Sequence, residues 1–120
     1  MKFFESPYYQ QDVIDLQTLQ ARVQELFVLM NIQEDNDVRV EFLHTLYAMI
    51  EKEQCLLVRL QLDGTKEAQA VMTDLHKNAV EAGMEPHHSL QTYHIQMKNN
   101  IKMELKELTG EDLDDEVVID

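Results

Sequence analysis

Helix-breaking residues most restrict what this 120-residue chain can fold into, because it has only three glycines and two prolines. A serine followed by proline is typical of a helix start, and glycine after an apolar periodic stretch is typical of a helix end. The boundary signals are Ser6-Pro7, Asp63-Gly64, Gly83 with Pro86, and Gly110. The segments between these points contain no helix breaker. The polar run Gln33-Glu34-Asp35-Asn36-Asp37 is typical of a turn and divides the first segment, so the chain can form four helices.

These segments predict an all-α fold of four helices. No segment alternates apolar and polar residues for long enough to predict a strand. Four amphipathic helices with short polar connections favour an antiparallel bundle, here with two long and two shorter helices in a single domain over residues 1–110. The predicted helices span residues 7–31, 37–61, 65–82 and 89–109.

Apolar residues in the first predicted helix recur at steps of three and four, which is typical of a seam between two helices. They are Leu16, Leu19, Val23, Leu26 and Met30. At 1.5 Å per residue, the first two helices are each about 35 Å long. A chain of this size leaves part of such long seams uncovered, so we expect it to form a homodimer.

The chain is strongly acidic, with 10 Lys and Arg against 23 Asp and Glu and a formal net charge of −13. This charge argues against direct binding to a nucleic-acid backbone or to an anionic membrane, both of which need basic residues. No apolar run reaches the length of a membrane span. Cys55 is the only cysteine, and we expect it to be a packed, inert thiol. With no signal-peptide pattern at Met1, these features predict a cytoplasmic protein.

Two polar residues occupy positions where the apolar stripes predict hydrophobic ones. Glu53 falls within the stripe of the second helix, and His94 falls within that of the fourth. A buried carboxylate without a partner is costly, so we expect Glu53 and His94 to hydrogen-bond inside the bundle or at a dimer seam. A polar pair that sets helix register is favoured over a catalytic pair. Asp12 and Gln20 have a similar place in the first seam.

Histidines give the chain two weak metal-binding patterns. Glu41 and His44 have the spacing of the di-iron carboxylate motif, but helical geometry places them away from the core. His87 and His88 lie in the loop after Pro86, without a cysteine or a tight ligand spacing. We therefore expect no metal and no other cofactor. A phosphate-binding glycine loop and a nucleophile elbow are also missing from the sequence, so we expect no enzymatic activity.

Both ends of the chain carry apolar side chains that could bind a partner. The last ten residues, 111–120, hold six acids and no base, and they predict a flexible acidic tail or a short additional helix. The candidate partner-binding residues are Phe3, Phe4, Tyr8 and Tyr9 at the start, and Leu113, Val117, Val118 and Ile119 in the tail.

Three short motifs resemble a small helical family of unknown function that is found mainly in cyanobacteria. They are Phe3-Phe4-Glu5-Ser6, Arg59-Leu60-Gln61-Leu62 and Gly83-Met84-Glu85-Pro86. The likeness runs over residues 3–90 and rests on helix ends and core positions. It implies a helical fold in a cyanobacterial cytoplasm, and it transfers no functional residue. The acidic tail departs from the family pattern.

Taken together, these features favour a non-enzymatic protein that binds another protein, as an adaptor or regulator, and acts as a homodimer. Its partner should have a basic or mixed surface, because a strongly acidic body attracts positive patches. Two alternatives remain open. One is an acidic mimic of nucleic acid that blocks a basic nucleic-acid-binding protein. The other is a metal-binding helical protein that uses Glu53, His94 or the histidine loop.

Overall fold

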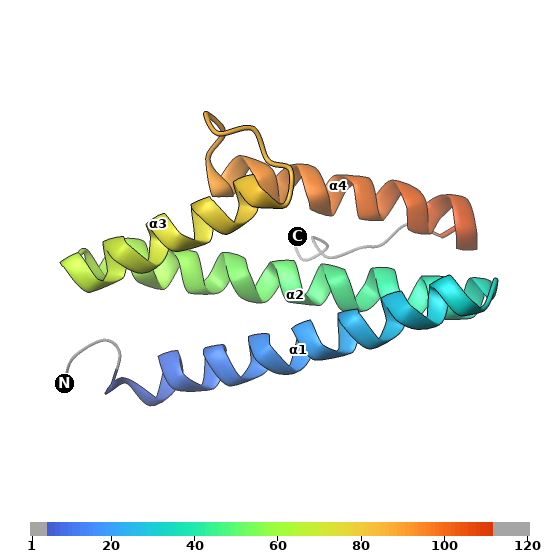
Figure 1. Cartoon of the computed structure of the whole chain (residues 1–120), viewed down its shortest axis with the longest axis horizontal. Helices are drawn as coiled ribbons and strands as arrows, with labels where there is room; N and C mark the ends of the chain where they lie inside the picture. The colour runs from blue at the N-terminus through green and yellow to red at the C-terminus, as the bar shows by residue number, and fades with distance from the viewer. Residues whose placement is uncertain (1–4, 112–120) are drawn as a thin grey trace, which may run out of the picture.

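The computed structural model describes residues 5–111, and within them it contains four α-helices and no strand (Figure 1). The all-α prediction is confirmed, and each helix boundary lies within two residues of the predicted one. The first two helices are the longer pair, as expected. The helices are α1 Pro7–Ile32, α2 Asn36–Asp63, α3 Lys66–Glu81 and α4 Leu90–Thr109.

Local side-chain chemistry explains where the helices begin and end. Each helix starts after a residue whose side-chain oxygen accepts a hydrogen bond from a backbone N–H in the first turn. Gly64 and Gly110 end α2 and α4 in the left-handed conformation, with φ of 68° and 76°. The four capping residues are Ser6, Asp35, Thr65 and Ser89.

Helix α2 lies at the centre of the molecule, with α1 along one side and α3 and α4 along the other (Figure 1). α1, α3 and α4 each run antiparallel to α2, so α3 and α4 point in the same general direction. The connection over residues 82–89 therefore steps sideways and does not reverse the chain. Together α3 and α4 cover the length of α2 that one long helix would cover.

Most buried apolar side chains of residues 5–111 form three clusters, and α2 contributes to each of them. One joins α2 to α4, one joins α2 to α1 and α3, and one joins α2 to the end of α3 and the start of α4. The first cluster contains Ile50 and Ile101, the second contains Leu16, Leu60 and Ala68, and the third contains Leu57, Ala79 and Met84. A wide arc of α2 is therefore buried, whereas α1 buries only one face.

Two sequence-based placements are wrong. Cys55 is exposed and not packed, because it faces the arc of α2 that no other helix covers. Gln20 is also exposed, at the edge of the α1 seam rather than inside it. None of the described helices has an apolar stretch long enough to cross a bilayer.

Candidate functional site

Glu53 and His94, the two polar residues found within apolar stripes, are hydrogen-bonded to each other. The Nε2 atom of His94 lies 3.2 Å from Oε2 of Glu53. His94 is only 3% exposed, whereas the Glu53 side chain keeps 24% of its surface exposed. Because an ionised carboxylate only accepts hydrogen bonds, His94 donates from Nε2. The other ring nitrogen of His94, Nδ1, is buried and has no hydrogen-bond partner.

A pocket of about 270 Å³ lies beside this pair, where side chains from all four helices meet. Its inner wall is apolar and buried, and it includes Leu16, Ile50 and Leu90. Its opening is formed by exposed residues, among them Asn78 and Ala82. The pocket arises because α3 ends here and α4 begins after a sideways step, so neither helix fills the space above the middle of α2. An apolar pocket with a few polar groups is the common form of a small-molecule site.

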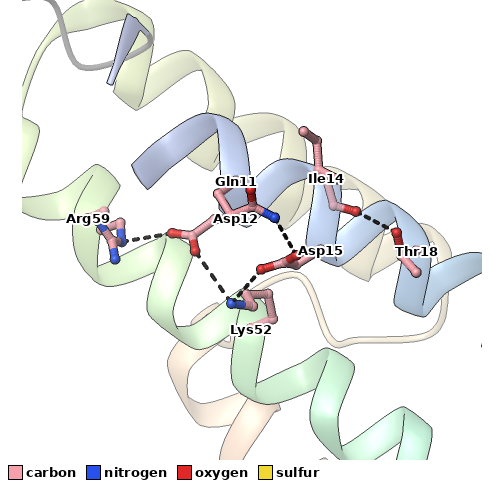
Figure 2. A network of polar contacts seen from close by, with 7 residues as sticks. All are labelled: Gln11, Asp12, Ile14, Asp15, Thr18, Lys52 and Arg59. Atoms are coloured by element: carbon pink, nitrogen blue, oxygen red, sulfur yellow. Dashed lines mark hydrogen bonds and ion pairs between the residues drawn. The ribbon is translucent and has the colours of Figure 1, made fainter. Parts of the chain in front are cut away.

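A second cluster of polar side chains connects α1 to α2 and surrounds the buried carboxylate of Asp12 (Figure 2). Asp12 is 6% exposed, and its Oδ2 atom lies 2.8 Å from Nε of Arg59. Lys52 lies between two carboxylates, with Nζ 3.5 Å from Asp12 Oδ1 and 3.2 Å from Asp15 Oδ2. Gln11 donates to Asp15 at 2.8 Å. Two basic residues of α2 therefore compensate the buried charge of Asp12, which indicates a structural role.

The same network shifts two pKa values in the directions that favour the charged forms. Hydrogen bonds from Gln11 and then from Lys52 hold the pKa of Asp15 below its ordinary value. The hydrogen bond to Asp15 raises the pKa of Lys52, although partial desolvation opposes this. Both groups stay ionised at neutral pH, so the network is a set of ion pairs that connects α1 to α2 and not a proton donor or acceptor.

Helix α1 has a second apolar face, opposite the one that packs on α2. Ile14, Ala21 and Val28 are spaced by seven residues along it, and Ile32 continues the line. All four are exposed, with Ile32 at 72%. At 100° per residue they fall on the side of α1 away from Val23, which belongs to the inner seam. An exposed apolar line on a surface helix is typical of an interaction face.

Tyr8 and Tyr9, the aromatic residues near the N-terminus that the structure describes, differ in burial. Tyr8 is exposed, and the guanidinium of Arg59 lies 5.7 Å from the centre of its ring. Tyr9 is partly buried against the cluster of Leu16 and Leu60, and this burial raises its pKa. The remaining candidate partner-binding residues, which are Phe3, Phe4, Leu113, Val117, Val118 and Ile119, lie outside the described residues, as does most of the acidic tail.

The two histidine patterns lie in different parts of the fold: Glu41 and His44 are on α2, and His87 and His88 are in the connection before α4. Glu41 forms an ion pair with Arg22 at 2.5 Å, and His44 is exposed. The rings of His87 and His88 meet edge to face with their centres 4.5 Å apart. Over residues 5–111, no three His, Cys, Asp or Glu side chains are grouped as metal ligands would be.

Five carboxylates within residues 5–111 pair with a Lys or Arg on a neighbouring helix. Arg39 on α2 pairs with Glu104 on α4, and Lys98 on α4 pairs with Glu51 on α2 at 3.5 Å. Arg22 makes the equivalent pair from α1 to α2. These pairs interrupt the acidic surface, whereas a mimic of nucleic acid needs unbroken rows of negative charge.

Two features of the site could not be assigned from the sequence alone. The outer face of α1 carries a visible signal, the seven-residue spacing of Ile14, Ala21 and Val28, but the inner seam of the same helix is stronger and hides it. The pocket carries no sequence signal, because it depends on how the connection over residues 82–89 offsets α4 from α3.

A family model described as a domain of unknown function, DUF1825, matches residues 1–107. No curated protein matches the chain, and no solved structure matches it.

Proposed function

Because the chain belongs to DUF1825, a family defined only as a domain of unknown function, we propose a role from its surface: it is a non-enzymatic interaction protein that acts as a homodimer. The observation that carries this proposal is the outer apolar face of α1. Ile14, Val28 and Ile32 are each more than half exposed there. Helices pair through apolar residues at two positions of each seven; here Ile14, Ala21 and Val28 occupy one position, and Ile32 is the apolar residue at the other, which also holds Thr18 and Glu25.

The residues on this face favour an antiparallel pair of α1 helices. If the two-fold axis passes beside Ala21, Ile14 of one copy meets Val28 of the other, because both lie seven residues from Ala21. The small side chain of Ala21 then lets the helices approach closely at the axis. A parallel pair in register would instead place Glu25 against its own copy, and like charges in contact are unfavourable.

A second partner of basic or mixed surface completes the proposal. It is supported by the net charge of −13, which attracts positive patches over a range of several ångströms. The aliphatic and acidic residues of 111–120 are the part of the chain that we propose binds this partner. The proposed setting is a cyanobacterial cytoplasm, which the motif resemblance and the single cysteine support.

The dimer is tested by measuring molar mass with light scattering after size-exclusion chromatography. We expect the wild-type protein to have a molar mass of twice 14.1 kDa. Ala21→Glu places two carboxylates at the proposed axis and should give a monomer. Ala70→Glu introduces the same change at an exposed alanine of α3 and should leave the dimer intact. Circular dichroism should show the same helix content in all three proteins.

Two outcomes contradict the proposal. A monomeric wild-type chain at concentrations of about 100 μM would exclude a dimer of useful affinity. A dimer that Ala70→Glu disrupts and Ala21→Glu does not would move the interface from α1 to α3.

A further inference from the structure

We propose that the pocket between the four helices binds a small organic ammonium, that is, a protonated amine attached to a compact apolar body. This site lies away from the outer face of α1, so it is independent of the proposed dimer. It is formed by one wall of buried apolar side chains and by the Glu53–His94 pair.

The size of the pocket sets the size of the ligand. A cavity of about 150 Å³ is sufficient to hold benzene. The 270 Å³ of this pocket therefore accommodates a body of roughly ten non-hydrogen atoms. Leu75, Leu90 and Met97 give it an apolar lining, and exposed Asn78 and Ala82 leave it open to solvent on one side. A ligand can therefore enter without unfolding of a helix.

The polar groups of the pocket select for a donor of hydrogen bonds. Glu53 lines the pocket and keeps 24% of its side-chain surface exposed, with its Oε2 atom 3.2 Å from Nε2 of His94. Gln20, Asn78 and Tyr93 also line the pocket and can donate or accept, whereas an ionised carboxylate only accepts. Glu53 is therefore the group that favours a ligand that donates.

The charge of the pocket selects for a cation. Its lining residues include Glu53 and contain no Lys or Arg. A carboxylate in a largely apolar pocket gains most from a partner that is positively charged, because the low polarity of the surroundings strengthens the attraction. A carboxylate ligand of the same size would place two negative charges together and is excluded on the same ground.

Isothermal titration calorimetry of the full chain tests this with three probes of matched size: 2-phenylethylammonium, 2-phenylethanol and phenylacetate. We expect the ammonium to bind about tenfold more tightly than the alcohol, and phenylacetate to bind least. Glu53→Gln keeps an oxygen that can accept from His94, so the fold is retained, and it should remove the preference for the ammonium. Glu81→Gln, an exposed change on α3, should leave the preference unchanged.

A second variant tests the location. Ala82→Leu adds bulk at the opening of the pocket and should weaken the ammonium and the alcohol alike. The proposal is overturned if phenylacetate binds as tightly as the ammonium, if the preference survives in Glu53→Gln, or if the wild-type chain gives no saturable heat with the ammonium. None of these results bears on the molar mass of the protein, so the two proposals fail separately.

Discussion

Polar side chains inside this helical protein are compensated in two different ways. Asp12 is surrounded by Arg59 and Lys52, and its charge is balanced within the α1–α2 contact. His94 makes one hydrogen bond with Glu53, and its second nitrogen has no partner. The first arrangement places a basic residue against each oxygen of Asp12, although Oδ2 accepts no well-directed hydrogen bond, and it holds two helices together. The second lies on the wall of a pocket, where the Glu53 side chain is partly exposed, and for that reason we assign binding to it.

The ion pairs of Lys52 with Asp12 and Asp15 should make the free energy of unfolding depend on pH. The pKa of Asp15 is lowered below its ordinary 3.8 by Gln11 and Lys52, so its ionised form stabilises the folded state above that pH. This contribution is lost as the pH falls through the lowered value. Asp15→Asn should therefore lower the urea midpoint near pH 7, and its deficit should be smaller near pH 2.

The matched control for this measurement is Asp74→Asn, an exposed carboxyl on α3, which should change the midpoint little at either pH. An equal deficit of Asp15→Asn at both pH values would show that its charge is not what stabilises the contact.

At the residue scale, the sequence located the unusual polar residues but not all of their surroundings. Glu53, His94 and Asp12 stood out because each interrupts an apolar stripe. Cys55 was misplaced because its neighbours Leu56 and Leu57 are buried, and neighbours along a helix point in directions about 100° apart. Whether a given arc of α2 is covered depends on three other helices, which a local pattern does not specify.

The helices themselves were predictable because their ends are determined by local chemistry. A side-chain cap begins each one, and Gly64 and Gly110 end two of them in a conformation that other residues adopt with strain. These signals lie within a few residues of the boundary, so no tertiary information is needed to place it.

Gly64 gives a direct test of this local control. Its φ is 68°, and a Cβ added there would meet no atom within 4 Å, so the cost of a side chain is that of the backbone alone. Gly64→Ala should lower the free energy of unfolding by about 1 kcal/mol, and Gly64→Asn by less, because asparagine tolerates this conformation better. Chemical denaturation measures both. A neutral or stabilising Gly64→Ala would show that the α2–α3 turn does not require glycine.

Helix α1 contains two overlapping apolar patterns. Its inner seam, centred on Val23, packs on α2, and its outer line through Ala21 faces solvent. Periodicity analysis favours the stronger of two overlapping patterns, so the inner seam was found and the outer line was not. An apolar face that the chain itself does not cover is the main support for self-association.

On the scale of the whole molecule, the arrangement around α2 separates the two proposed activities. The dimer face is on the far side of α1, and the ammonium pocket opens between α1, α3 and α4. The number and length of the helices followed from the sequence, but the shared direction of α3 and α4 did not (Figure 1). That arrangement depends on the path of residues 82–89, whose glycine and proline indicate a turn without specifying whether the chain reverses.

Cysteine cross-linking tests the proposed homodimer most directly. In a Cys55→Ser background, Ala21→Cys places one thiol from each copy beside the two-fold axis, where their Cα atoms should come within the range of about 4.4–6.8 Å that a disulfide requires. Mild oxidation should convert most of this protein into a covalent dimer on a non-reducing gel, whereas Ala70→Cys in the same background should remain monomeric on that gel. Equal cross-linking of the two variants, or none at Ala21→Cys, would contradict an α1–α1 interface.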